Sequence, residues 1–172
     1  MMRVLVAVAS RHGATREIAE TIAEALREST ASTGDGPVVD VLSCGEVADL
    51  SGYQAVVVGS SVYMGRWMDA ARELVRREQD ALTALPVWLF SSGPVGEPPR
   101  PREEAVDVAE IGLLCHAREH HVFGGRIDRA QLGFGQRAIV AALRVPDGDY
   151  RDWTEIREWA SRIARELTVE LI

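Results

Sequence analysis

The chain has 172 residues, of which 47% are hydrophobic and 26% charged, and its formal net charge at pH 7 is -7. This length suits one well-buried core, because domains typically run to about 100–150 residues, and we expect a single domain over residues 1–172. The acidic charge excludes a nucleic-acid binder, which needs a basic surface, and no segment approaches the ~20 apolar residues of a membrane-spanning helix.

The predicted strands are five apolar runs rich in β-branched residues. They cover residues 4–8, 38–42, 55–58 and 87–90, with a weaker run over residues 121–127. Most of these runs show no polar alternation, which is typical of strands buried on both faces of a parallel sheet that helices cover. We therefore expect the sheet to be parallel throughout.

The segments between the strands have helical periodicity. The pattern predicts helices over residues 15–28, 67–82, 102–118 and 153–171. In the first of them Ile18, Ile22 and Leu26 recur on one stripe, as in a helix that packs on a sheet. Strands that alternate with helices define a doubly wound α/β fold with helices on both faces.

The loop after the first strand is the first candidate binding segment, because ligands of open parallel sheets bind beyond the carboxyl ends of the strands. Its residues are Ser10, Arg11, His12, Gly13, Ala14 and Thr15. It directly precedes a helix, whose free N–H groups and dipole favour an anion such as phosphate. Ser10 and Thr15 can donate to phosphate oxygens, although both residue types also serve as simple helix caps.

The loop after the third strand combines small polar residues with aromatic ones. We expect a ligand to contact Ser60, Ser61, Val62, Tyr63, Met64, Gly65 and Trp67. This composition suits a planar ring that is stacked by an aromatic side chain while backbone groups bind its edge. Tyr63 and Trp67 are the candidates to flank that ring, and the alternative for each is packing between the loop and a helix.

The loop after the fourth strand offers hydroxyls and unpaired backbone groups to the same edge of the sheet. Its candidate ligand contacts are Ser91, Ser92, Gly93, Pro94 and Gly96. They suit a polyhydroxylated chain and the polar edge of a ring, and the alternative is a structural turn.

Several stretches of this sequence resemble known families. The Ser-x-x-Gly-x-Thr loop over residues 10–15 resembles the phosphate loop of flavodoxins, with His12 where they usually have Thr and Ala14 where they often have Asn. The segments GATREIA, SSVYMGRW and DWTEIREWASRIA resemble the flavodoxin-like, menaquinone-dependent protoporphyrinogen oxidase family over nearly the whole chain. This resemblance implies a flavodoxin-like five-stranded parallel sheet of order 2-1-3-4-5 and FMN as the cofactor.

The resemblance also implies an FMN-dependent oxidoreductase that transfers reducing equivalents through flavin N5 to a quinone or similar acceptor. Its partners would be a small redox substrate of the porphyrinogen type and either a quinone or a redox protein. The acidic charge also fits a non-enzymic electron carrier between protein partners, and the departures at His12 and Ala14 leave open a deazaflavin or a lost flavin. Trp153 and Trp159 could pack in the core or at a homodimer interface.

The segment between the fifth strand and the last helix, residues 126–152, contains the stretch FGQRAIVAALRV, which predicts an amphipathic helix of about three turns. In the protoporphyrinogen oxidase family this segment is longer and more basic. The shorter stretch lacks the Lys, Arg and aromatic density of a membrane-surface helix, so we expect peripheral membrane contact at most. A soluble lid and a partner-binding helix are the alternatives.

The remaining reactive residue types give no further site. His116 and His120 have the i, i+4 spacing of a metal pair, but we expect them to cap and solvate a helix end, and no metal is predicted. His121 is a candidate neighbour of the flavin. Cys44 and Cys115 are too few for a disulfide framework, which favours a reducing, cytoplasmic location, and no catalytic side chain is predicted.

Overall fold

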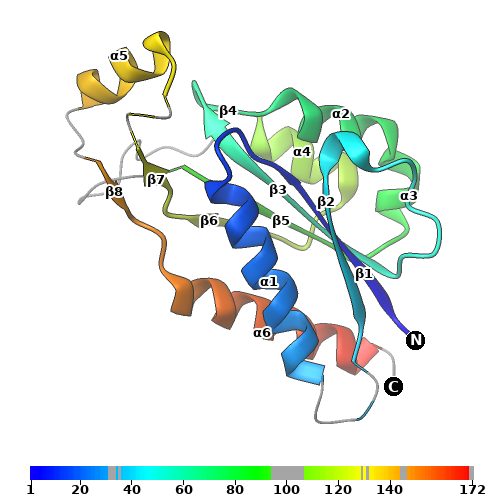
Figure 1. Cartoon of the computed structure of the whole chain (residues 1–172). Coiled ribbons are helices and arrows are strands. Elements are labelled where there is room, and N and C mark those ends of the chain that lie inside the picture. Colours follow the sequence, from blue (N-terminus) through cyan, green and yellow to red (C-terminus); the bar gives the residue numbers. More distant parts are fainter. Residues whose placement is uncertain are drawn as a thin grey trace.

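The computed structural model describes residues 1–30, 34, 36–93, 107–128, 130, 132–143 and 147–170. Its main sheet contains five parallel strands: β1 (Arg3–Ala9), β2 (Val38–Ser43), β3 (Ala55–Tyr63), β5 (Val87–Ser92) and β6 (Glu119–Phe123). They run in the order β2-β1-β3-β5-β6 (Figure 1), which confirms the predicted order 2-1-3-4-5.

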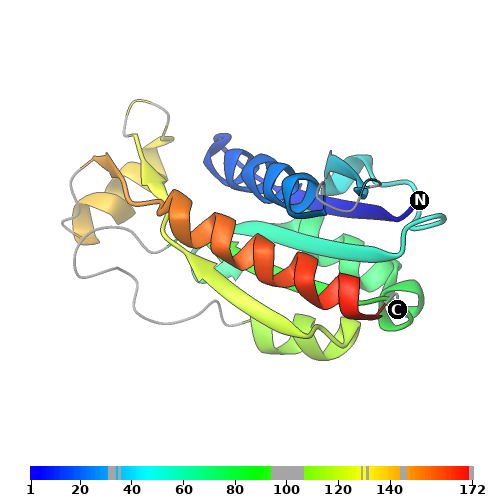
Figure 2. The same ribbon diagram turned by 90° about the horizontal axis from the view of Figure 1, so that it is seen from below.

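Helices cover both faces of this sheet. The helices α1 (Ala14–Thr30) and α6 (Trp153–Glu170) lie on one face, and α2 (Asp69–Arg77), α3 (Gln79–Thr83) and α4 (Val108–Cys115) lie on the other (Figures 1 and 2). A short 3-10 turn over Cys44–Glu46 follows β2. The two faces have separate apolar cores because consecutive strand residues point to opposite sides: Val4 packs toward α1, and Leu5 packs toward α2.

The predicted helix over residues 67–82 is wrong at its start and in its middle. Trp67 belongs to the short strand β4 (Arg66–Trp67), which pairs with β3. The helical part is then divided at Glu78, whose φ of -102° and ψ of 19° end α2 and begin α3. Helical periodicity continues across the break, because both helices bury residues on the same face of the sheet.

The predicted helix over residues 102–118 is shorter among the described residues. Its described part, α4, ends at Cys115, because His116 adopts a left-handed conformation with φ of 52°. Residues 102–106 lie outside the described part of the chain. The predicted strand over residues 121–127 divides into β6 and the short β7 (Arg126–Ile127).

The segment between β6 and α6 forms a small extension at the carboxyl ends of the strands. Here β7 pairs antiparallel with β8 (Gly148–Asp149), and α5 (Phe134–Leu143) projects from the layered core (Figure 1). The helix expected in this segment is thus present. Across the described ranges, we find no helix with the length and apolarity needed to span a membrane.

Candidate functional site

The first loop forms an open cup at the start of α1. Gly13 has a φ of 88°, which favours glycine, and its N–H donates to Ser10 Oγ at 3.1 Å. A Cβ placed on Gly13 would meet no atom within 4 Å, so the space above the turn is open. Thr15 is only 2% exposed and stands in the first turn of α1. The first N–H groups of that turn lack intrahelical acceptors, and the helix dipole adds positive potential, so the cup favours an anion.

A buried arginine that is distant in the sequence, Arg151, hydrogen-bonds to the start of α1 at this cup. The side chain of Arg151 is 4% exposed, and its guanidinium donates to the Ala14 carbonyl at 3.1 Å and to Glu17 Oε2 at 2.5 Å. It also donates to both carboxylate oxygens of Asp149, at 2.8 and 2.7 Å, and lies over the Trp153 ring. Arg151 therefore ties the start of α1 to the segment that follows β8.

The charges in this cluster stabilise one another. The hydrogen bonds from Arg151 hold the pKa of the Asp149 carboxyl below its ordinary value. Conversely, the hydrogen bond to Asp149, followed by that to Glu17, raises the pKa of Arg151. A cation so well paired serves to position the loop, and the sequence offered no local signal for it because its partner Ala14 lies 137 residues away.

The second loop is a tight β-hairpin between β3 and β4. Val62 pairs with Trp67, and Tyr63 pairs with Arg66. The two residues of the turn both have positive φ, 54° at Met64 and 73° at Gly65, as in the type I′ turns whose twist matches a hairpin. Met64 is an unusual choice at such a position, and it is 69% exposed at the tip.

The base of the hairpin is fixed by buried polar contacts. Trp67 is 2% exposed, and its Nε1 donates to Ser91 Oγ at 2.7 Å. Its backbone N–H lies 3.3 Å from both carboxylate oxygens of Asp107, and the next N–H, of Met68, donates to Ser60 Oγ at 2.9 Å. Trp67 therefore lies beneath the loop, as in the packing alternative, while Tyr63 is half-buried at its surface.

The third loop meets the hairpin through its buried hydroxyls. Ser91 lies 2.7 Å from His120 Nε2 and accepts the bond from Trp67, so its hydroxyl is used within the protein. Ser92 is 4% exposed, and the Gly93 N–H donates to the Phe123 carbonyl at 3.3 Å. The predicted contacts Pro94 and Gly96 lie outside the described residues.

The structure brings the first two loops into contact. The guanidinium of Arg11 lies 4.8 Å from the centroid of the Tyr63 ring. Because β1 and β3 are neighbours, Ala9 is in register with Ser60 and the two loops leave the sheet side by side. Ser61 and Val62 are half-buried in β3 below the hairpin, and Ser61 Oγ lies 3.0 Å from Met68 Sδ.

Among the histidines and cysteines, His12 belongs to the first loop and His120 contacts Ser91 of the third loop, while the others pack elsewhere. His121 packs between Phe123 and Trp159 under α6, with Nε2 2.7 Å from Glu155 Oε1. The His116 and His120 pair is not helical, since α4 ends before it, and the described residues contain no group of three or more His, Cys, Asp or Glu able to hold a metal. Burial raises the pKa of the Cys44 thiol to about 12, which leaves it unreactive.

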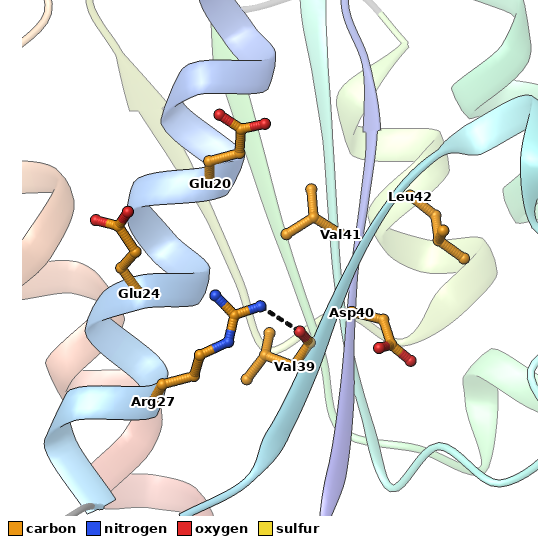
Figure 3. A pocket seen from close by; sticks show the side chains of 7 residues that line it. All are labelled: Glu20, Glu24, Arg27, Val39, Asp40, Val41 and Leu42. Carbon is orange, nitrogen blue, oxygen red and sulfur yellow. Dashed lines mark hydrogen bonds between the residues drawn. The ribbon is translucent and has the colours of Figure 1, made fainter.

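A separate depression of about 520 Å³ lies between α1 and the edge strand β2. Its lining residues are Glu20, Glu24, Arg27, Val39, Asp40, Val41 and Leu42 (Figure 3). Arg27 donates to the Val39 carbonyl across it, while the side chains of Val39 and Val41 point toward α1 (Figure 3). None of the predicted site residues lines this depression.

The fold is that of a doubly wound α/β protein, and the first two loops meet at the carboxyl edge of its sheet, where proteins of this class bind their ligands. The chain belongs to the flavodoxin domain family, which it matches over residues 5–154. Proteins of the flavodoxin family bind FMN.

The chain is also distantly related to an enzyme. It is 23% identical to protoporphyrinogen IX dehydrogenase [quinone] of Escherichia coli strain K12, and the similarity covers 95% of each chain.

Solved structures share the fold. An archaeal flavodoxin superposes with a TM-score of 0.63 at 16% identity, covering 97% of this chain and 99% of the flavodoxin. Rubredoxin oxygen:oxidoreductase from Desulfovibrio gigas superposes with a TM-score of 0.67 at 15% identity. The match covers 98% of this chain but only 37% of the Desulfovibrio protein.

Proposed function

We propose that this protein is an FMN-dependent oxidoreductase that oxidises a substrate of the porphyrinogen type and passes the reducing equivalents to a quinone. The observation that carries this proposal is the anion cup of Ser10, Gly13 and Thr15 beside the Tyr63 hairpin. It occurs in a chain related over 95% of its length to a quinone-linked dehydrogenase.

The cup fits the phosphate of FMN. Its turn is open above Gly13, and the hydroxyls of Ser10 and Thr15 can donate to phosphate oxygens together with the N–H groups of the first helical turn. Arg151 fixes the first turn of α1 through the Ala14 carbonyl, so the donors are already oriented before a ligand arrives.

The hairpin fits the ring of the flavin. Tyr63 is the aromatic side chain at the surface of the loop, and it stays our candidate to flank the ring, with the buried bonds of Trp67 holding the hairpin in place. When bound, FMN supplies the redox chemistry at N5, and the protein orients it and adjusts its electronics by hydrogen bonds and charge.

The first test is the visible spectrum of the purified protein, followed by titration of FMN into any apo fraction with flavin fluorescence as the readout. We expect Thr15→Ala to weaken FMN binding about tenfold, the value of one hydrogen bond to a charged group. Thr21→Ala is the matched control, because Thr21 lies further along the same helix. Absence of quenching at about 100 μM, a limit near 5 kcal/mol, would contradict FMN as the cofactor.

The second test is turnover by the FMN-loaded protein. We expect anaerobic oxidation of protoporphyrinogen IX when menaquinone is added, measured by the appearance of porphyrin fluorescence. A holoprotein that binds FMN but oxidises no porphyrinogen with any quinone would contradict the proposed reaction while leaving the cofactor assignment intact.

A non-enzymic electron carrier is the second candidate. The archaeal flavodoxin matches this chain from end to end, and the net charge of -7 would suit a positively charged redox partner. Fast electron exchange with a reductase protein, together with slow direct reaction with quinone, would select this function over the first.

A further inference from the structure

Two arginines lie close to Tyr63. The guanidinium of Arg11, from the first loop, lies 4.8 Å from the centroid of the Tyr63 ring. Arg66 is the direct partner of Tyr63 in the β3–β4 pair. Residues directly opposite each other in an antiparallel pair point to the same side, with Cβ atoms about 4.5–5.5 Å apart. Two cationic residues from two different loops therefore lie on the same side of the hairpin as this ring.

These two arginines lack counter-charges. Both are exposed, and in the described part of the chain neither has a carboxylate partner, although the protein has 26 acidic residues against 19 basic ones. Neighbouring arginines are paired: Arg16 with Glu20, Arg72 with Asp69, and Arg151 with Asp149. Two like charges beside one ring repel each other, and a bound anion would relieve this repulsion.

Two exposed apolar side chains, Met64 and Phe134, lie on the segments next to the two arginines. Met64, at the tip of the same hairpin, is 69% exposed. The first turn of α5 approaches from the other side: a Cβ placed on Gly135 would lie 4.0 Å from the Tyr63 hydroxyl oxygen, and the adjacent Phe134 is 93% exposed. A ligand bound here would meet an aromatic and aliphatic surface under its body and cations at its edge.

We infer that Arg11 and Arg66 form a carboxylate clamp that holds an apolar ring compound with acidic side chains against Tyr63. This inference rests on the proposed function and names the residues that recognise its substrate. A guanidinium group binds a carboxylate through two parallel hydrogen bonds, so each arginine can take one acidic side chain. Porphyrinogens with propionate groups belong to this class of compound.

The charge distribution favours a small ligand over an acidic protein. Electrostatic interactions are screened over about 8 Å at physiological ionic strength. A small carboxylate that reaches the hairpin therefore interacts mainly with the two arginines. An acidic protein surface would also face the rest of a molecule whose net charge is -7.

The test compares a charged ligand with its neutral ester. The FMN-loaded protein is titrated with protoporphyrin IX and, in the same non-ionic detergent, with its dimethyl ester, with the change in the porphyrin absorption spectrum as the readout. The variants are Arg11→Gln and Arg66→Gln. Arg76→Gln is the matched control, because Arg76 is an exposed arginine on α2 and has no carboxylate partner in the described ranges.

We expect each clamp variant to weaken binding of the dicarboxylate on the order of tenfold or more, the usual value of a charge-assisted hydrogen bond. Binding of the dimethyl ester should not change in either variant, Arg66→Gln should keep the affinity for FMN, and Arg76→Gln should bind both porphyrins as the wild type does. In turnover, the loss should be in KM and not in kcat, because the clamp contacts a part of the substrate that does not react.

The outcomes separate this inference from the proposed function. Equal binding of the acid and the ester by the wild type, or no difference between Arg66→Gln and Arg76→Gln, would overturn the clamp even if porphyrinogen is oxidised. Charge-dependent porphyrin binding without turnover would support the clamp and contradict the proposed reaction. An Arg11→Gln variant that loses FMN as strongly as porphyrin would assign Arg11 to the phosphate and overturn its part in the clamp.

Discussion

The start of α1, at the end of the first loop, and the tip of the hairpin lie at the same edge of the sheet, but they differ in how fully their polar groups are paired. At the first loop, Thr15 is 2% exposed, and the Arg151 side chain behind it is 4% exposed with a partner at each end of its guanidinium. At the hairpin tip, Met64 is 69% exposed in a left-handed conformation, and Arg66 has no carboxylate partner among the described residues.

This difference agrees with the two binding tasks that we propose. A site that must always hold the same phosphate benefits from donors that are oriented in advance, since less ordering is then needed on binding. A site that must recognise a second compound needs polar groups that are still free to pair. Backbone strain, which is common at functional sites, is likewise found at the hairpin and is absent from the described turn at Thr15.

The largest effect that we predict comes from Arg151→Ala. It would leave Asp149, Glu17 and the Ala14 carbonyl without their shared donor, and we expect the free energy of unfolding to fall by about 2–4 kcal/mol. Urea denaturation measures this loss, and FMN titration of the folded fraction should show weaker binding. Unchanged FMN affinity would mean that the first loop keeps its shape without the Arg151 side chain.

The control for this variant is Arg157→Ala. Arg157 also joins α6 to α1, through Glu24 and Glu28 at 3.2 Å each, but its side chain is 44% exposed. Exposed ion pairs contribute about 0–1 kcal/mol, so this variant should lose little stability and no FMN affinity.

The next effect concerns the base of the hairpin. Trp67→Phe keeps the ring in the core but removes the hydrogen bond from Nε1 to Ser91, at 2.7 Å. The control is Trp88→Phe, because Trp88 is also fully buried and its Nε1 has no hydrogen-bond partner. Both variants lose ring volume, so the difference between their unfolding free energies should be about 1–2 kcal/mol, the cost of the lost bond and the unpaired hydroxyl. Equal losses would show that the bond does not fix the hairpin.

The parts of this molecule that the sequence predicts are those with local signals. The strands follow from continuous apolar runs such as residues 55–58, and the open turn before α1 follows from Gly13 between two hydroxyl residues. Residues that act through distant contacts have no such signal. Asp107 lies 40 residues from Trp67, and Arg151 lies 134 residues from Glu17, so neither could be assigned to the site before the fold was known.

The hairpin was hidden for a different reason. Its turn residues are Met64 and Gly65, and the usual signal for a type I′ turn is Asn or Asp before Gly. The apolar periodicity that begins at Trp67 instead favoured an early helix start. Arg66, which we place in the clamp, was missed with it, because only the pairing of Arg66 with Tyr63 brings it to the ring.

A smaller effect is predicted for the strained tip. Met64→Asn should raise the free energy of unfolding by about 0.5–1 kcal/mol, since asparagine tolerates the left-handed conformation better than methionine does. For a protein of this size that is a rise of about 1–4 °C in Tm by calorimetry. Met64→Ala is the control, because alanine keeps a Cβ at the same φ and should give no gain. A lower Tm for Met64→Asn would show that the methionine side chain itself stabilises the loop.

The smallest effect is a pH dependence of the stability that the Asp149–Arg151 ion pair contributes. The pKa of Asp149 is lowered in the folded protein by its hydrogen bond from Arg151, so its stabilisation is complete above the ordinary value of 3.8 and is lost as pH falls through the folded pKa. The Asp149 side chain is 42% exposed, so its contribution is about 0.5 kcal/mol.

Asp149→Asn should therefore differ in stability from the wild type at pH 7, and the difference should disappear as the pH falls well below 3.8. Repeating the substitution in Arg151→Ala should make the difference at pH 7 smaller, because the side-chain hydrogen bonds from Arg151 are then absent, while the backbone N–H of residue 151 still donates to the Asp149 carboxylate, as it does at 3.1 Å in the wild type. A difference of unchanged size in that background would show that Asp149 stabilises the fold through contacts other than the Arg151 side chain.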